Sequence, residues 1–220
     1  TVAQALVGAG QIANDPASLP YLLFNSASVY GGMLDVPYYL DDATTGNPLT
    51  TRWEAQCDSG VALQTLTAEQ IGALEASVPD ENAASHALCQ SLGLANYGID
   101  TERHLTKFNP LPVTKSMQSI EVQVTLPNIT NANVIRAAQG LPGIAAKPDA
   151  GWPVVILQHG ITSNKNDMLA ATGFLSMFGF ATVAIDHPMH ASRGFVMGEG
   201  DSAVVINAAD AVEGSDATTY

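Results

Sequence analysis

The densest apolar pattern of the chain lies in residues 152–195. Residues 154–157, Val-Val-Ile-Leu, are enclosed by a proline and a glycine, which predicts a short strand buried on both faces. An apolar run over residues 168–178 stops at Gly179 and predicts a helix. Residues 180–185 are again apolar and predict a second buried strand. The segment therefore predicts a strand, helix and strand unit with parallel strands.

Weaker patterns predict the elements on either side. They are an edge strand with Pro37 over residues 29–40, a turn-rich loop over 41–49, a helix capped by Thr67, a second helix over 81–92, and a surface connection over 131–151. Residues 119–126 alternate, which predicts a strand whose Glu121, Gln123 and Thr125 face water.

These elements predict an α/β fold with a mostly parallel sheet and helices on both of its faces. We expect three parts along the chain: an N-terminal segment and first strand over 1–40, a small helical insertion over 41–115, and the sheet core over 116–220. The chain starts at Thr1 without a methionine, so we expect that its original N-terminus has been removed.

Composition excludes some partners. The 220 residues are 46% apolar, which is enough for a sizeable core. Eight basic residues against 21 acidic ones give a net charge of −13, which disfavours binding to nucleic acid.

The two cysteines, Cys57 and Cys89, fit none of the close-spaced patterns that hold zinc. We expect a disulfide that stabilises the fold by roughly 3 to 4 kcal/mol if the compartment is oxidising. The alternative is two buried thiols that behave as small apolar residues.

Candidate chemistry gathers where the two central strands end. Parallel strands end at one edge of a sheet, so His159, Gly160 and Ile161 should face the segment that begins at Asp186. Backbone N–H groups in a tight turn after a strand can form an oxyanion hole for acyl transfer. The alternative is that Gly160 only permits the turn into the helix.

A metal site is a second hypothesis for the same edge. His159, Asp186, His187 and His190 are residue types that bind zinc or another transition metal. Their spacing repeats no established ligand signature, which favours an alternative. In that alternative Asp186 caps a turn and the histidines bond to the backbone near residues 192–193. We therefore expect neither a metal nor another cofactor.

No nucleophile motif accompanies these residues. The sequence contains no Gly-x-Ser-x-Gly, no Walker-type phosphate loop, and no Gly-x-Gly-x-x-Gly after a strand. A phosphate-binding function is therefore disfavoured.

Two segments carry a family resemblance. Residues 153–168 and 184–195 resemble the α/β-hydrolase domain of bacterial extracellular lipases and lysophospholipases, the virulence-factor lipase family, and residues 34–40 and 53–60 resemble it more weakly. The resemblance implies that the strand ending at Gln158 is the third of the hydrolase sheet and that the next three residues form its oxyanion turn. It also implies a Ser, Asp/Glu and His triad in that order, and a secreted or outer-membrane-associated protein.

We therefore expect the N-terminal part of a secreted lipase-like esterase that acts on lipid or other esters, truncated before its nucleophile elbow and inactive alone. The family order gives no triad role to Asp186, and neither Ser163 nor Ser192 lies at an elbow. We expect the strand over 153–158 to pair with the missing C-terminal part or with a second copy. The alternative function is a non-enzymatic binding module with a hydrolase-like half-sheet.

Overall fold

The computed structural model describes residues 1–41 and 48–210. Residues 42–47, within the expected loop and insertion, and 211–220, within the expected core, lie outside the described residues. The chain forms two compact units, one from residues 1–35 with the chain from Ser119 onward and one from residues 36–118.

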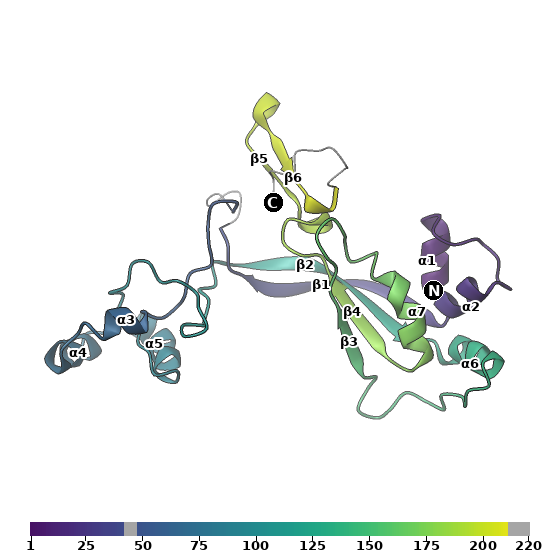
Figure 1. Ribbon diagram of the computed structural model, residues 1–220, viewed down its shortest axis with the longest axis horizontal. Helices are drawn as coiled ribbons and strands as arrows, with labels where there is room; N and C mark the ends of the chain where they lie inside the picture. The colour runs from purple at the N-terminus through teal and green to yellow at the C-terminus, as the bar shows by residue number, and fades with distance from the viewer. Residues whose placement is uncertain (42–47, 211–220) are drawn as a thin grey trace. The chain divides into compact units, whose positions relative to one another are not determined.

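The first unit contains a four-stranded sheet with the order β1-β2-β4-β3 (Figure 1). Its strands are β1 (Ala27–Tyr38), β2 (Ser116–Pro127), β3 (Val154–Leu157) and β4 (Ala181–Ile185). The strand with Pro37 lies at one edge, as predicted, and β3 lies at the other.

The sheet is mixed, so the prediction of a mostly parallel sheet was wrong. β3 and β4 are parallel, and β2 and β4 are antiparallel. β1 and β2 also run in opposite directions, because Asn128 N–H donates to Ser26 C=O at one end. At the other end Lys115 N–H donates to Tyr38 C=O. The chain leaves along β1 and returns along β2, which makes this pair antiparallel. Among the described strands of this sheet, only β3 and β4 are parallel, because the connection between them crosses over through the helix of residues 169–177.

The helices of the first unit pack together. They are α1 (Val2–Gly8), α2 (Leu19–Asn25), α6 (Ile129–Ala138) and α7 (Leu169–Met177), and α7 lies along β4 (Figure 1). A Cβ atom on Gly173 would lie 2.8 Å from the carbonyl oxygen of Leu23, so glycine allows α7 to approach α2 this closely. None of the described helices is long and apolar enough to cross a membrane.

Helix α6 replaces the first part of the predicted surface connection over 131–151. Asn128 caps it by accepting a hydrogen bond from Asn131 N–H, and Ala132 and Ile135 are buried. Its Asn and Thr residues have weak helix propensity, so packing rather than local sequence decides this helix.

The burial of β2 and β3 departs from the prediction at several positions. Gln123 and Thr125 are buried at 7% and 0% exposure, whereas Val154 and Ile156 of β3 are 58% and 80% exposed. Two residues of the predicted wet face of β2 are therefore covered, whereas Glu121 is exposed as predicted. The predicted burial of β3 on both faces was wrong. Because the side chain of Ile156 is so exposed, helices do not cover both faces of the described sheet either.

Polar partners explain how the covered face can hold these residues. The hydroxyl oxygens of Thr125 and Thr182 are 2.6 Å apart, and Gln123 Nε2 donates to the carbonyl oxygen of Lys165 at 2.9 Å. Buried polar groups are tolerated when such hydrogen bonds are made.

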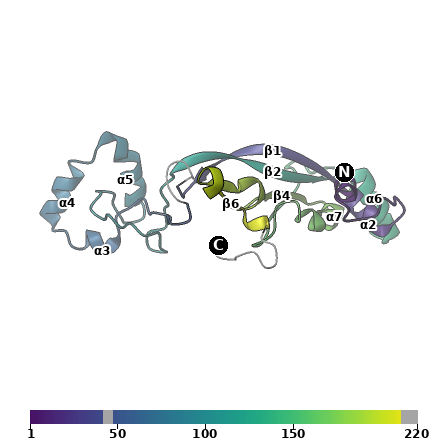
Figure 2. The same cartoon turned by 90° about the horizontal axis from the view of Figure 1, so that it is seen from above.

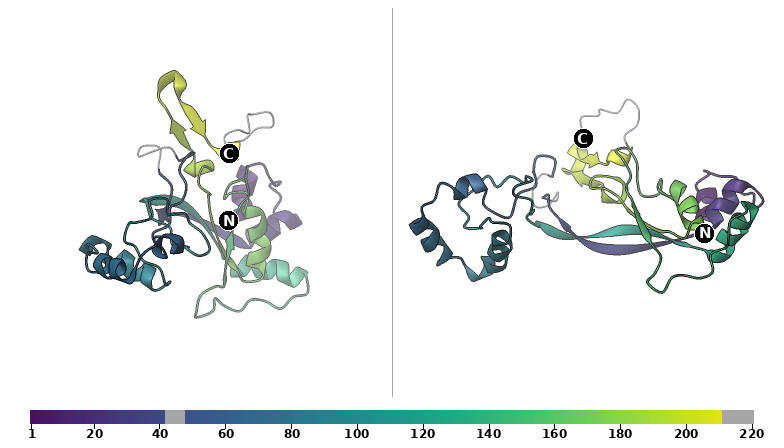
Figure 3. Two further views of the ribbon diagram at one scale, coloured as in Figure 1. Left: turned by 60° about the vertical axis from the view of Figure 1, so that its left-hand side comes forward. Right: turned by 60° about the horizontal axis from the view of Figure 1, so that its bottom comes forward.

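A hairpin follows the sheet. It consists of β5 (Phe195–Met197) and β6 (Val204–Ile206), joined through the short 3-10 turn η3 (Gly200–Ser202) (Figure 3). Two further 3-10 turns, η2 (Ala191–Arg193) and η4 (Ala208–Asp210), precede and follow it. Gly198 has φ +82°, and a Cβ there would lie 2.8 Å from the carbonyl oxygen of Ser202. The turn therefore requires glycine.

The second unit contains short helices (Figure 2). They are α3 (Gly60–Leu63), α4 (Ala68–Glu75), the 3-10 turn η1 (Asp80–Asn82) and α5 (Ala83–Gln90). The predicted capping box of Thr67 is present at the start of α4. The disulfide between Cys57 and Cys89 is confirmed.

Few apolar side chains are buried in this unit, so polar and covalent links hold it together. The fully buried carboxylate of Asp58 accepts N–H groups of Tyr97, Gly98 and Asp100, at 2.6, 3.1 and 3.0 Å. The neighbouring Cys57 offers its carbonyl oxygen to Asn109 Nδ2 at 2.7 Å. A small core of this kind depends on such staples.

Replacing both cysteines by alanine should therefore lower the free energy of unfolding by about 3 to 4 kcal/mol, because the crosslink closes a sequence separation of 32 residues. Urea unfolding of the oxidised protein and of the Cys57→Ala/Cys89→Ala variant measures the difference. Titration of the unfolded, unreduced protein should find no free thiol. Two reactive thiols would contradict the disulfide.

The buried hydroxyl pair of Thr125 and Thr182 predicts strong coupling. Thr125→Val or Thr182→Val alone leaves one buried hydroxyl without a partner and should cost about 1 to 3 kcal/mol. The double variant removes both hydroxyls and should cost less than the sum of the single changes. Additive costs in a double-mutant cycle would show that the pair contributes nothing specific.

Candidate functional site

Three imidazole rings meet at the carboxyl ends of β3 and β4. The ring centre of His159 lies 4.5 Å from that of His187 and 5.1 Å from that of His190. His159 is 3% exposed and follows β3, whereas the other two histidines follow β4. The predicted juxtaposition of the two strand ends is present.

Hydrogen bonds fix the protonation of His159. The backbone N–H of His187 donates to His159 Nε2 at 2.9 Å, so that nitrogen carries no proton. The proton therefore lies on Nδ1, which donates to the carbonyl oxygen of Gly160 at 2.8 Å. In return, His187 Nε2 bonds to the carbonyl oxygen of His159 at 3.1 Å. The two turns are thus pinned together, and neither nitrogen of His159 is available as a base.

The other two histidines also bond to the backbone. Burial lowers the pKa of His187, and the neighbouring His159 lowers it further. His190 bonds through Nδ1 to the carbonyl oxygen of Pro188 at 2.9 Å, and its buried Nε2 has no hydrogen-bond partner among the described residues.

The side chains at this edge are not arranged to bind a metal ion. Within residues 1–41 and 48–210, no group of three or more His, Cys, Asp or Glu residues is arranged to hold a metal ion. The histidines bond to the backbone of their own two turns rather than near residues 192–193.

The turn after β3 presents two backbone donors. In the described part of the chain, neither Gly160 N–H nor Ile161 N–H donates to a protein acceptor. Gly160 is exposed, and the Ile161 side chain is 69% exposed. These two adjacent N–H groups lie on an accessible turn and can donate to a ligand.

The glycine of this turn is not required by the backbone or by packing. Gly160 does not have a positive φ, and a Cβ built on it would meet no atom within 4 Å. The alternative that Gly160 only permits the turn therefore has no support in the local geometry. Space for a ligand next to the backbone remains a reason for glycine here.

Backbone strain is concentrated at the same edge. Among the described residues, the non-glycine residues with positive φ are Thr162, Met189 and Ala191, at 67°, 65° and 44°. All three lie in the segments that follow β3 and β4. Such conformations cost about 1 to 3 kcal/mol each, persist only where surrounding contacts impose them, and cluster at functional sites.

A buried ion pair supplies those contacts. Lys165 donates to both carboxylate oxygens of the fully buried Asp186, from its backbone N–H and from Nζ, each at 2.7 Å. The Nζ atom also lies 2.8 Å from Glu121 of β2. Ser192 Oγ donates to Asp186 at 2.6 Å. One carboxylate therefore anchors the segments after both strands.

These contacts set the protonation states of the pair. Burial would raise the pKa of Asp186, but the hydrogen bonds from Lys165 and Ser192 outweigh burial and lower it to about 2. Burial would likewise lower the pKa of Lys165, but its bonds to Asp186 and Glu121 raise it. Both groups are charged at neutral pH.

Sequence reasoning placed Asp186 at this edge but missed its partners. Lys165 and Ser192 lie 21 and 6 residues away from it in the chain, and Glu121 comes from another strand. The sequence did contain one signal for a buried ion pair, because Asp186 directly follows an apolar strand and a buried carboxylate needs a cation as its partner.

A groove of about 450 Å³ adjoins this ion pair. It is formed by β1, β2 and the loop after β3, and its lining includes Val29, Met33, Val122 and Lys165. The surface beside the charged pair is therefore largely apolar.

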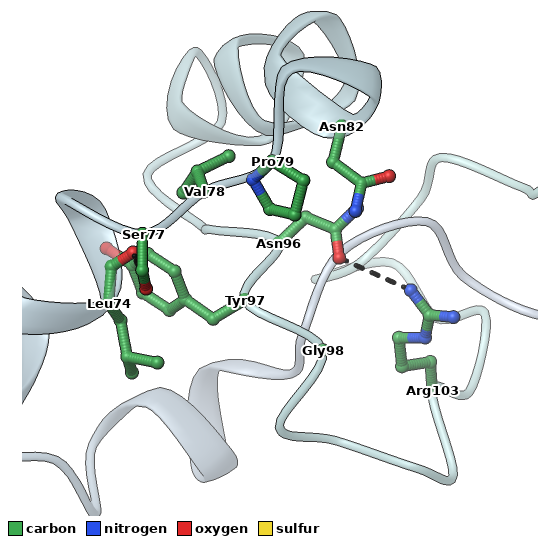
Figure 4. A pocket seen from close by; sticks show the side chains of 9 residues that line it. All are labelled: Leu74, Ser77, Val78, Pro79, Asn82, Asn96, Tyr97, Gly98 and Arg103. Atoms are coloured by element: carbon green, nitrogen blue, oxygen red, sulfur yellow. Dashed lines mark hydrogen bonds between the residues drawn. The ribbon is translucent and has the colours of Figure 1, made fainter.

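The second unit has its own cavity of about 270 Å³ (Figure 4). Figure 4 shows Tyr97 and Arg103 on different sides of it, with Arg103 Nη1 donating to Asn96 Oδ1 at 3.4 Å. The phenol of Tyr97 donates to Glu75 at 2.6 Å, and this bond raises the pKa of Tyr97 to about 12.

His86 in the same unit is also fully engaged. It accepts Asn96 N–H on Nδ1 at 3.2 Å and bonds to Glu75 through Nε2 at 3.1 Å. With both nitrogens occupied, the Glu75 and His86 pair holds α4 against α5 and offers no free base.

Comparison of the chain with protein-family models, curated proteins and solved structures gave no match.

The ion pair makes a direct prediction about stability. Lys165→Met would leave the Asp186 carboxylate buried without its cation and should lower the free energy of unfolding by about 3 to 5 kcal/mol. Glu121→Gln is the matched control, because the Glu121 side chain is 54% exposed and should matter by less than about 1 kcal/mol. Equal stability of the two variants in urea would show that the buried pair contributes no more than the surface contact.

The same pair predicts the pH dependence of folding. The pKa of Asp186 is about 2 when folded and about 3.9 when unfolded, so the unfolded chain binds its proton first as pH falls. Roughly 2 to 3 kcal/mol of stability, fully present above pH 4, should be lost as pH falls through 2. Asp186→Asn should lack this component in matched unfolding curves.

Proposed function

We propose that this chain is the N-terminal part of a carboxylic ester hydrolase of the lipase or lysophospholipase type, and that Gly160 and Ile161 supply backbone N–H groups of its oxyanion hole. The observation that carries the proposal is the turn after β3. It offers two adjacent N–H groups without acceptors in the described chain, at a glycine that neither φ nor packing requires.

The chemistry follows from charge development during ester hydrolysis. When a nucleophile attacks the ester carbonyl, the carbonyl oxygen becomes negative, and donors already aimed at it lower the barrier. The Lys165 and Asp186 clamp and the bonds of His159 hold this turn before substrate arrives. The turn therefore has little need to reorganise during the reaction.

The fold offers partial support. The α/β-hydrolase order implied by the resemblance places the third strand beside the fourth, and β3 lies parallel to β4. The antiparallel pairing of β2 departs from the expected mostly parallel sheet.

The serines near the turn do not supply a nucleophile. Ser163 Oγ donates to Asp167 at 2.8 Å, and Ser192 Oγ donates to Asp186 at 2.6 Å. Both hydroxyl protons are held by carboxylates, whereas an activated serine needs a base such as histidine. The proposal therefore places the triad outside these 220 residues and the chain alone is inactive.

The proposed esterase function also suggests a substrate class and a cellular location. The apolar groove beside Lys165 would hold the hydrocarbon part of a lipid ester. A secreted or outer-membrane-associated protein fits the Cys57–Cys89 disulfide, because such bonds persist in oxidising compartments.

A non-enzymatic binding module remains the second candidate. Val154 and Ile156 on the edge strand are 58% and 80% exposed, and exposed apolar side chains at a sheet edge mark interaction surfaces.

The oxyanion role can be tested in a gene product that contains this chain together with a Gly-x-Ser-x-Gly segment. Ile161→Pro removes one N–H donor and should lower kcat on short-chain nitrophenyl esters about a hundred- to a thousand-fold. Ile161→Ala keeps the N–H and is the control, expected to stay within about threefold of the parent.

Two results would contradict the proposal. Equal rates for the proline and alanine variants would remove the oxyanion role of this turn. Stoichiometric labelling of the 220-residue chain alone by a fluorophosphonate would show a nucleophile inside it, where we expect neither labelling nor ester hydrolysis.

A further inference from the structure

Strand β3 presents an unpaired backbone edge. It pairs with β4, and no other described strand lies beside it. Ala181 N–H donates to the carbonyl oxygen of Pro153 at 2.9 Å, so Pro153 faces β4. Successive residues of a strand alternate in direction, and the N–H and C=O groups of Val154 and Ile156 therefore point away from β4. These groups form a template for another strand.

The edge is short, with four residues, but it lacks the charged side chains that usually prevent pairing. Its outward residues Val154 and Ile156 are 58% and 80% exposed. Residues 152–163 include no Asp, Glu, Lys or Arg, and the strand itself contains no bulge-forming glycine or proline. Natural edge strands are commonly protected by such residues, whereas β3 has only its short length and the preceding Pro153.

We propose that the 220-residue chain forms a dimer in which β3 pairs antiparallel with β3 of a second copy. The alternation of backbone direction requires that outward-pointing residues lie opposite each other in the two copies. Among the registers that satisfy this, Val154 opposite Ile156 of the second copy pairs both outward residues of each strand, and the two-fold axis then passes between the Val155 residues of both copies. Val155 faces its counterpart in a non-hydrogen-bonded pair.

The strand is self-complementary in this register, and its two outward side chains are both apolar and exposed, so a second copy offers the matching surface. The same two outward residues supply every donor and acceptor on both sides. Val154 and Ile156 side chains of the two copies would also form one apolar cluster, which continues onto Val183 of β4 because Val183 is the register partner of Ile156. A two-fold pairing uses up the β3 edge of each copy, so association through β3 stops at two.

Charge sets the conditions for this dimer. Each copy has a net charge of −13, so two copies repel each other, but the pairing segment itself carries no charge. Added salt screens the repulsion, with a Debye length of about 8 Å at physiological ionic strength. The dimer should therefore strengthen as salt is added, whereas a charge-driven partner would bind more weakly.

A crosslink tests the register. Cysteines in a non-hydrogen-bonded antiparallel pair lie about 4.5 Å apart between Cα atoms, within the range of a disulfide. Val155→Cys should give a covalent dimer on mild oxidation. Ile156→Cys is the matched control and should crosslink much less, because its counterpart in the second copy is offset by two residues. Equal crosslinking of both variants would overturn the proposed register.

A surface substitution tests the dimer without a new cysteine. Ile156→Lys changes an exposed side chain, so the monomer should still fold, and should weaken dimerisation by about a hundredfold because both copies lose the apolar contact. Light scattering over a concentration series, at low and high salt, measures the change. A monomer at all concentrations, or a dimer unaffected by Ile156→Lys, would overturn the proposal. These measurements detect association and not ester hydrolysis, so they are independent of the proposed function.

Discussion

The buried ion pair between Lys165 and Asp186 is the contact on which the sheet edge depends. Two charges removed from water are costly to bury, and they are tolerated only when each is paired and hydrogen-bonded. Here one carboxylate receives the backbone N–H and Nζ of Lys165 together with the hydroxyl of Ser192. Those residues belong to the segments after different strands. The pair therefore joins two loops that the sequence separates by a helix and a strand.

This anchoring accounts for the strained backbone nearby. Thr162 and Ala191 have positive φ angles, which residues other than glycine rarely adopt. Each of them lies within three residues of a hydrogen-bond partner of Asp186. His159 adds a second link, because it accepts a backbone N–H from one turn and donates to its own. His159 and His187 thus connect the two turns, and the N–H groups of Gly160 and Ile161 have no protein acceptor within the described chain.

The two faces of the sheet show how packing can override pattern. Alternation along β2 predicts that Gln123 and Thr125 face water, yet both are buried, whereas Val122 and Val124 are half-buried. Cross-strand and loop partners, Thr182 and the carbonyl of Lys165, make that burial possible. The apolar face and the edge of β3 are left partly open, which is the physical basis for expecting association there.

Local sequence by itself determined the strand, helix and strand unit, the cap at Thr67 and the position of His159-Gly160-Ile161 at a strand end, because short-range periodicity and turn chemistry govern these features. The tertiary structure alone decided the direction of β2, helix α6 and the face of the sheet that is buried. It also decided that Asp186 binds Lys165. These outcomes depend on contacts between residues far apart in the chain, and local propensity carries no information about such contacts.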